Sequence, residues 1–183
     1  TRLRVQDGQG SCAGEAVHDR DVAAVVPQRA DALGHPGAAA VVAMFPDDRL
    51  LIVKQYRHAV GRYIWEIPAG TLDAKENGIT CAKREIIEET GYRADSWTPL
   101  GSITPLPGYS DEQIHLFLAR DLSPAEQNLD YDEVLSVHEI PFDQAIKMIQ
   151  EGSIQDAKTI CALYLARDHL EKNSREPVSY THL

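Results

Sequence analysis

Residues 70–92 read GTLDAKENGITCAKREIIEETGY, and this stretch decides the fold. Glu85, Glu88 and Glu89 are spaced three and four residues apart, so on a helix they project from one face. Like charges at this spacing repel one another, and helix stability alone would not select them. A divalent cation such as Mg²⁺ removes the conflict, because it takes carboxylate oxygens and commonly bridges to substrate phosphates. The spacing therefore predicts a magnesium site on a helix; the alternative is a solvated acidic helix face.

The flanking positions are not explained by a solvated acidic face. They are Gly70, Glu76, Arg84 and the pair Gly91-Tyr92. With all of them filled, the stretch resembles the signature of the Nudix hydrolases, which cleave nucleoside diphosphates linked to another group. The resemblance extends over about residues 35–172. It implies an α/β fold, the Nudix-type α/β/α sandwich with a mixed β-sheet.

The resemblance also implies roles for individual residues. The metal ligands are three helix carboxylates and one backbone carbonyl, those of Glu85, Glu88, Glu89 and Ala69. Arg84 is expected to orient a neighbouring glutamate, a role common around metal sites, or else to form a salt bridge on the helix surface. Glu76 precedes the helix, and we expect it to hold the loop through hydrogen bonds. Gly70 is expected to let the backbone turn sharply.

The catalytic base is not part of this stretch. In the ADP-ribose-cleaving branch of the family it usually comes from an acidic loop in the second half of the chain. Here Asp130-Tyr131-Asp132-Glu133 precedes the apolar run VLSV, and Glu133 stands at the matching place. We expect Glu133 to be the base, with Asp132 as the alternative residue and a solvated acidic turn as the alternative interpretation. Arg84 and Glu88 complete the expected catalytic set.

Three features outside the stretch resemble the ADP-ribose pyrophosphatases. They are Gln55-Tyr56-Arg57 at a strand end, the segment WEIPAG at 65–70, and Pro107, sixteen residues after Gly91. Pro107 and the following glycine also read as an ordinary tight turn. We expect Arg57 to hold a phosphate or the terminal ribose, and Glu66 to accept from a ribose hydroxyl or hold the loop. The alternative for Arg57 and Glu66 is an ion pair at a strand end. Pro107 is expected to take part in substrate binding together with these two residues.

Hydrophobic patterning predicts a mixed sheet between helices. The run AAAVVAMF at 38–45 is continuously apolar, as in a strand buried on both faces, and it forms a hairpin with 50–56. Asn77 and Gly91 stand where an N-cap and a left-handed C-cap are wanted, and 69–77 reads as a loop. Further strands are expected at 63–67, 98–104, 113–119 and 134–139, and helices at about 78–90, 141–150 and 155–171.

Composition limits the class of protein. With 183 residues, 43% of them hydrophobic and 25% charged, the chain is long enough for one globular domain with a core. The formal net charge of −10 argues against nucleic acid as a partner, because nucleic-acid binding requires a basic surface. Cys12, Cys81 and Cys161 lie far apart and read as free thiols in a reducing, cytoplasmic compartment. No apolar run reaches the length of a membrane span, so no membrane contact is expected.

Both ends of the chain are set apart from the expected domain at 35–172. Residues 1–34 are weakly patterned; in family members this region forms strands that help to build a dimer, which makes a homodimer the expected assembly. Residues 173–183 are expected to be a tail that is disordered or artefactual, because 177–183 lack periodicity and resemble a translated sequencing adapter.

The resemblance implies an Mg²⁺-dependent hydrolase, with Mn²⁺ as a substitute, that converts the small-molecule nucleotide sugar ADP-ribose to AMP and ribose 5-phosphate. One alternative is hydrolysis of GDP-mannose or a UDP-sugar, since the helix signature is the same and only pocket residues elsewhere decide. Another is a non-catalytic sensor that binds ADP-ribose; such proteins generally lose the helix glutamates, which are present here. A third is an inactive fragment, if residues 1–34 are not native sequence.

Overall fold

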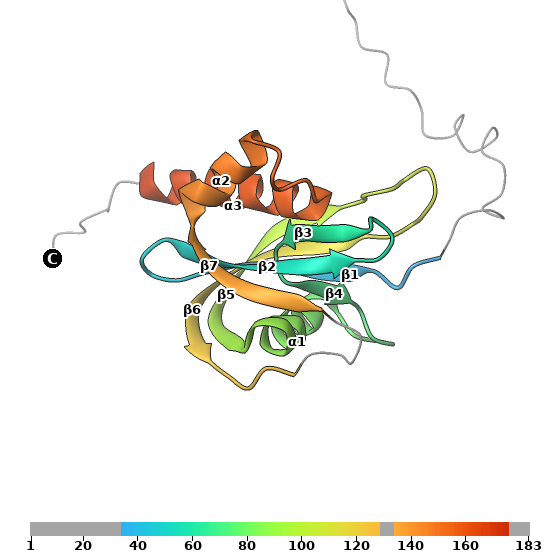
Figure 1. The fold of residues 1–183 in the computed structure, drawn as a ribbon. Helices are drawn as coiled ribbons and strands as arrows, with labels where there is room; N and C mark the ends of the chain where they lie inside the picture. The colour runs from blue at the N-terminus through green and yellow to red at the C-terminus, as the bar shows by residue number, and fades with distance from the viewer. Residues whose placement is uncertain (1–33, 129–133, 176–183) are drawn as a thin grey trace, which may run out of the picture. The chain divides into compact units, whose positions relative to one another are not determined.

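The computed structural model describes residues 34–128 and 134–175, all of which lie in the compact unit Ala32–Leu183. Predictions made for residues 1–33, for Asp132 and Glu133, and for 176–183 fall outside the described residues. Within the described ranges, no helix is both long and apolar enough to cross a membrane. The elements follow in the order shown in Figure 1: β1 (Ala38–Met44), β2 (Arg49–Arg57), β3 (Arg62–Glu66), β4 (Ala69–Thr71), α1 (Gly78–Thr90), β5 (Tyr92–Ile103), β6 (Ile114–Pro124), β7 (Leu135–Pro141), α2 (Phe142–Gln150) and α3 (Ala157–Arg175).

β1 lies in the middle of the mixed sheet, and all seven of its residues are buried. It runs parallel to β6, in register from Ala38↔Ile114 to Ala43↔Ala119. Its start pairs antiparallel with β4 and its end antiparallel with β2, which confirms the expected hairpin. β3 and β7 pair with β2, and β5 pairs with β6. Because β1 has neighbours on both edges and helices over both faces, it is continuously apolar, as the sequence predicted.

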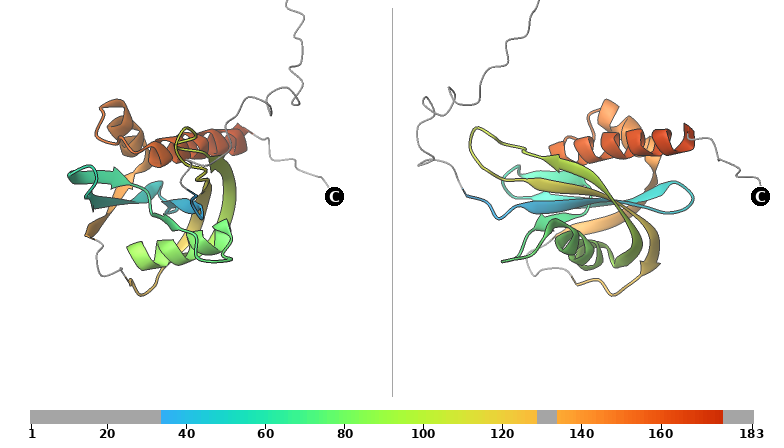
Figure 2. Two further views of the ribbon diagram at one scale, coloured as in Figure 1. Left: turned by 90° about the vertical axis from the view of Figure 1, so that its right-hand side faces the viewer. Right: turned by 180° about the vertical axis from the view of Figure 1, so that it is seen from behind.

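Two helical layers enclose the sheet, with α1 on one face and α2 and α3 on the other (Figure 2). Side chains of β1 alternate between the two cores: Ala40 and Val42 pack with α2 and α3, Ala39 and Val41 with α1. Cys81 is fully buried in the core beneath α1. The architecture is the expected α/β/α sandwich with a mixed sheet.

α1 begins and ends where the local sequence predicts. The Asn77 side chain accepts a hydrogen bond from the Thr80 N–H at 2.9 Å, which satisfies one of the donors left over in the first turn. Gly91 adopts a φ of 70°, in the left-handed region, and its N–H donates to the Ile87 carbonyl at 2.9 Å. The small and apolar residues Cys81, Ala82 and Ile86 pack on the sheet, and the same face buries Glu85 and Glu89.

One element and several boundaries differ from the expectation. β4 is a three-residue strand inside the segment expected to be a loop, and so short a piece shows no periodicity. β5 begins at Tyr92 rather than 98, directly after the helix cap, and β6 continues to Pro124 rather than ending at 119. Pro99 obscures the pattern of β5; it is tolerated because β5 is an edge strand with an irregularity between Pro99 and Gly101. α3 runs to Arg175, into the segment set apart as a tail.

Candidate active site

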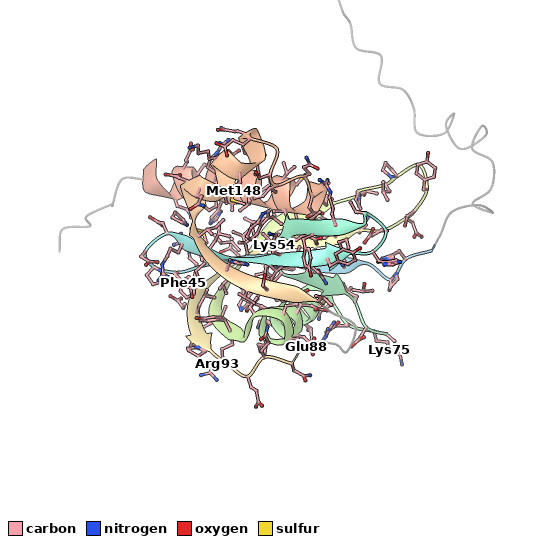
Figure 3. The ribbon with its side chains drawn as sticks, in the orientation of Figure 1. Phe45, Lys54, Lys75, Glu88, Arg93 and Met148 are labelled. Carbon is pink, nitrogen blue, oxygen red and sulfur yellow. The ribbon has the colours of Figure 1, made fainter. Side chains whose placement is uncertain are left out.

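A cleft of about 580 Å³ lies where β4 and α1 meet the start of α3 and the β5–β6 connection. A volume of this order suits a small-molecule ligand. Figure 3 shows the side chains around the sheet, with Glu88 labelled on α1 and Lys75 on the loop that leads to it. Residues of both charges face the cleft from five segments of the chain: Arg57, Asp73, Arg84, Glu85, Glu112, Asp156 and Lys158.

Gly70 leaves room for the carboxylate of Glu85. A Cβ atom at position 70 would lie 1.8 Å from Glu85 Oε1 and 2.0 Å from its Cδ, so the carboxylate could not stay where it is. Gly70 lies within β4 and its φ is not positive, so the sharp turn expected from the sequence was the wrong reason for this glycine. The glycine is needed because a helix carboxylate lies directly against the strand backbone.

Arg84 lies among three carboxylates of α1 and the preceding loop. Its Nη1 donates to Glu85 Oε1 at 2.6 Å and to Glu88 Oε2 at 2.9 Å, while Nη2 donates to Glu76 Oε2 at 2.9 Å. The hydrogen bond to Glu76, above the others, raises the pKa of Arg84, and the same bond lowers the pKa of the Glu76 carboxyl. These contacts fit both the orienting role and the salt bridge on the helix surface, and the role of Arg84 stays a prediction.

Glu76 holds the loop that leads to α1. Its Oε2 accepts from the Asp73 N–H at 3.0 Å, and its own N–H donates to the Asp73 carbonyl at 2.9 Å. Arg84 Nη2 also donates to the Thr71 carbonyl at 3.1 Å, which joins β4 to the same network. The hydrogen bonds expected of Glu76 as a loop-supporting residue are therefore present.

Glu89 connects α1 to the residue before Gly70. Its side chain is almost completely buried, at 2% exposure, and its Oε2 accepts from the Ala69 N–H at 3.1 Å. A buried carboxylate needs such donors, because burial without them strongly disfavours the charged form. Ala69 and Gly70 are thus contacted by two glutamates from one helix face, Glu89 and Glu85.

The oxygen atoms of this site are suitable ligands for a hard divalent cation. Carboxylate and carbonyl oxygens are the ligands that Mg²⁺ and Mn²⁺ take, and the missing side chain of Gly70 brings one carboxylate against β4. In the part of the chain that the structure describes, no three acidic, histidine or cysteine side chains are grouped so that they could hold a metal ion. Arg84 instead engages Glu85 and Glu88. The expected ligand set stays a prediction: Glu85, Glu88, Glu89 and the Ala69 carbonyl.

Arg57 and Glu66 pair with each other at the ends of β2 and β3. The guanidinium donates from Nε to Oε1 and from Nη2 to Oε2, both at 2.7 Å. Lys158 on α3 also donates to Glu66 Oε2, and its Nζ lies 3.1 Å from Asp156 Oδ2. Burial raises the pKa of Glu66, but the hydrogen bond from Arg57 and the charge of Lys158 outweigh it and leave the pKa below its usual value. The strand-end ion pair is present, and the substrate roles of both residues stay predictions.

Four of the expected site residues that the structure describes are not among those lining the cleft: Glu66, Glu88, Glu89 and Pro107. Pro107 is exposed, whereas Pro105 in the same connection faces the cleft. The part of Pro107 in substrate binding stays a prediction. Glu133, the expected base, and its alternative Asp132 lie between the described ranges 34–128 and 134–175.

Four charged lining residues were not singled out from the sequence: Asp73, Glu112, Asp156 and Lys158. Asp156 accepts from the Thr159 N–H at 2.9 Å, so its local pattern marks the start of α3. That pattern says nothing about what the first turn faces. Lys158 binds Glu66, which precedes it by 92 residues, and no local sequence pattern could indicate a contact over that separation.

Comparison with known proteins points to one family. Residues 34–163 match the family model described as the NUDIX domain. An ADP-ribose pyrophosphatase of Bacillus subtilis (strain 168) is 41% identical over 131 residues, which cover 70% of this chain and 71% of that protein. A GDP-mannose pyrophosphatase of Yersinia enterocolitica is 36% identical over 142 residues, which cover 73% of this chain and 74% of that protein.

The fold has a counterpart among solved structures. A crystal structure of an ADP compounds hydrolase matches it with a TM-score of 0.70 and 26% identity, covering 76% of this chain and 75% of that one. The sequence match and the fold therefore agree, and this chain belongs to the Nudix hydrolases.

Proposed function

We propose that this hydrolase cleaves the pyrophosphate bond of ADP-ribose and releases AMP and ribose 5-phosphate. The observation that carries the proposal is the cleft that Glu85 of α1 shares with Arg57 and Lys158. A nucleotide sugar brings a diphosphate, whose charge must be neutralised, and a terminal sugar, whose hydroxyls need hydrogen-bond partners; the cleft offers groups for both. The similarity to an ADP-ribose pyrophosphatase at 41% identity supports this substrate.

We infer that Mg²⁺, or Mn²⁺ in its place, is the cofactor. The residues that would hold it are Glu85, Glu88, Glu89 and, through its carbonyl, Ala69. When bound, such a cation neutralises phosphate charge and lowers the pKa of a coordinated water. Arg84 orients two of these carboxylates through its 2.6 and 2.9 Å hydrogen bonds.

The other end of the substrate is assigned to β2 and β3. Arg57 uses Nε and Nη2 to bind Glu66, so its Nη1 is the group available to a phosphate or ribose oxygen. The Arg57 side chain is 40% exposed, which leaves it accessible from the cleft. Glu66 is 2% exposed at its side chain and acts here by holding Arg57. Pro107 would shape the connection that borders the cleft.

Removing divalent cations is expected to abolish activity. Without a cation, the helix carboxylates would repel a diphosphate of the same charge, and no metal-bound water of lowered pKa would be present to attack the phosphorus. AMP release from ADP-ribose, followed by chromatography, should stop in EDTA and return when Mg²⁺ or Mn²⁺ is added in excess. Full activity in a buffer freed of metal would contradict the proposed cofactor.

ADP-ribose is expected to be hydrolysed with a higher kcat/KM than GDP-mannose or UDP-glucose. The helix carboxylates treat all three diphosphates alike, so the difference must come from groups such as Arg57 that lie away from α1. The measurement is kcat/KM for each compound under one Mg²⁺ concentration. A preference for GDP-mannose would favour the second candidate function, which the relative of 36% identity supports.

Glu133→Gln is expected to lower kcat by about 100- to 10,000-fold with KM nearly unchanged, since a general base acts in the transition state. The comparison is with Asp132→Asn in single-turnover measurements with saturating Mg²⁺. If only the Asp132 variant slows the chemical step, Asp132 is the base; if neither does, the base lies elsewhere.

A further inference from the structure

We propose that Lys158 is a positioning residue for the substrate, which acts through Glu66 to hold the guanidinium of Arg57 at the cleft. The proposal rests on the proposed function, because it assigns Arg57 to the substrate. It adds a residue from α3 to a site otherwise built from β2, β3, β4 and α1. Nothing in the local sequence around Lys158 indicates this role.

Glu66 lies between two cations that come from different layers of the fold. Its side chain is 2% exposed, Arg57 reaches it from β2, and Lys158 reaches it from α3. Arg57 occupies both carboxylate oxygens through Nε and Nη2, and Lys158 donates to one of them, Oε2. The buried carboxylate is therefore shared, and its position depends on both partners.

Arg57 depends on this arrangement more than a buried arginine would. Its side chain is 40% exposed, so packing alone does not fix its rotamer. Its Nη1 has no hydrogen-bond partner among residues 34–128 and 134–175, and the residue lines the cleft. The direction in which Nη1 points is set by the planar contact with Glu66, because the guanidinium is rigid.

Lys158 is itself held in place. Its side chain is 13% exposed, and Asp156 Oδ2 lies 3.1 Å from its Nζ. The same oxygen accepts from the N–H and Oγ1 of Thr159 at 2.9 and 2.6 Å, which caps α3. Thr159 Oγ1 in turn accepts from the Ile67 N–H at 3.0 Å, next to Glu66. A rigid helix end thus presents the lysine to the carboxylate that orients Arg57.

A purely stabilising ion pair would have a different signature. Losing it would lower the melting temperature and leave the kinetics of the folded enzyme unchanged. Loss of a positioning residue weakens substrate binding in the folded enzyme, and that loss disappears once the connecting carboxylate is gone. The Glu66→Gln variant allows the two roles of Lys158 to be told apart. When Lys158→Met is added to it, the charges of Glu66 and Lys158 are both gone, and no buried carboxylate is left without its lysine partner.

The experiment is a double-mutant cycle on the full chain with Mg²⁺. Lys158→Met is expected to raise KM for ADP-ribose about tenfold while kcat changes by less than about threefold, since misplacing a binding group costs mainly binding. Lys158→Arg should recover most of the loss, because it keeps a cation at this position. In the Glu66→Gln background, Lys158→Met should add less than about twofold. Lys54→Met is the matched control: Lys54 lies over the Trp65 ring and does not line the cleft, and wild-type kinetics are expected.

Two results would overturn the proposal. Unchanged KM in Lys158→Met, whatever its melting temperature, would make Lys158 a structural residue. A tenfold penalty that persists in the Glu66→Gln background would mean that Lys158 touches the substrate itself. The proposed function is tested separately, on the wild-type chain. If the wild type prefers another nucleotide sugar, the mutant cycle is measured on that compound, and the same outcomes decide on Lys158. If the wild type neither hydrolyses nor binds any nucleotide sugar in calorimetry, both proposals fail.

Discussion

Replacing Glu89 by glutamine is expected to lower kcat by roughly two to four orders of magnitude, the cost of removing one key electrostatic group from an active site. Glu89 is 2% exposed, and its Oε2 accepts from the Ala69 N–H at 3.1 Å. Glutamine keeps the shape, and its amide oxygen can accept the same hydrogen bond. The substitution therefore removes charge with little change in packing. The measurement is kcat at saturating ADP-ribose and Mg²⁺, together with the melting temperature of each protein.

The control for this variant is Glu76→Gln. Glu76 also belongs to the acidic network, but its bonds run to Arg84 and to the Asp73 backbone, which makes it a support for the loop. We expect a much smaller loss of kcat than in the Glu89 variant. Equal losses in the two variants would show that the division between metal ligand and loop support is wrong.

Gly70→Ala is expected to reduce kcat/KM by at least about 100-fold in a protein that remains folded, since small displacements of catalytic groups cost this much. The new Cβ would overlap the Glu85 carboxylate, with 1.8 Å to Oε1 and 2.4 Å to Oε2. The carboxylate must leave, and it can do so cheaply because it is the end of a flexible side chain. The backbone of position 70 lies in a strand that alanine can adopt. Activity and Mg²⁺ affinity should therefore fall while the melting temperature stays near that of the wild type.

Gly108→Ala provides the matched comparison for Gly70→Ala. A Cβ at position 108 meets nothing within 4 Å, and no positive φ occurs there, so wild-type activity is expected. If Gly70→Ala keeps full activity, catalysis does not depend on the position of the Glu85 carboxylate against β4. If it unfolds instead, the assumption that Glu85 moves aside is wrong.

The part of the fold that depends on local chemistry was predictable from the sequence. The ends of α1 follow from Asn77 and Gly91, whose cap preferences act within a few residues. The position of β1 was predictable because a strand that is buried on both faces has a continuous run of apolar residues. Elements that depend on distant neighbours were not predictable in this way. β4 exists because three residues pair with the start of β1. β5 tolerates Pro99 because, among the strands that the structure describes, only β6 pairs with it.

The same division applies to the site. The spacing of Glu85, Glu88 and Glu89 matches helix periodicity, so the sequence alone is enough to place these residues together on one element. The role of Gly70 was misread, since a glycine that admits a carboxylate from a helix looks like a turn glycine in sequence. The link from Arg57 through Glu66 to the start of α3 joins three segments far apart in the chain, and it emerges only from the folded structure.

The five-residue segment 66–70 restricts where the chain can be lengthened. Its Ile67 N–H donates to Thr159 Oγ1 of α3 and its Ala69 N–H to Glu89 Oε2 of α1, so two amides only two residues apart are held by opposite helical layers. Adding or deleting one residue between these two amides would shift one of them away from its acceptor, so at least one of the two bonds would be lost. An insertion between positions 67 and 69 is therefore expected to destabilise the fold, whereas the exposed tip at 106–109 can be lengthened. Attempts to change the substrate range by loop grafting belong at that tip, with the spacing between Glu66 and Gly70 kept as it is.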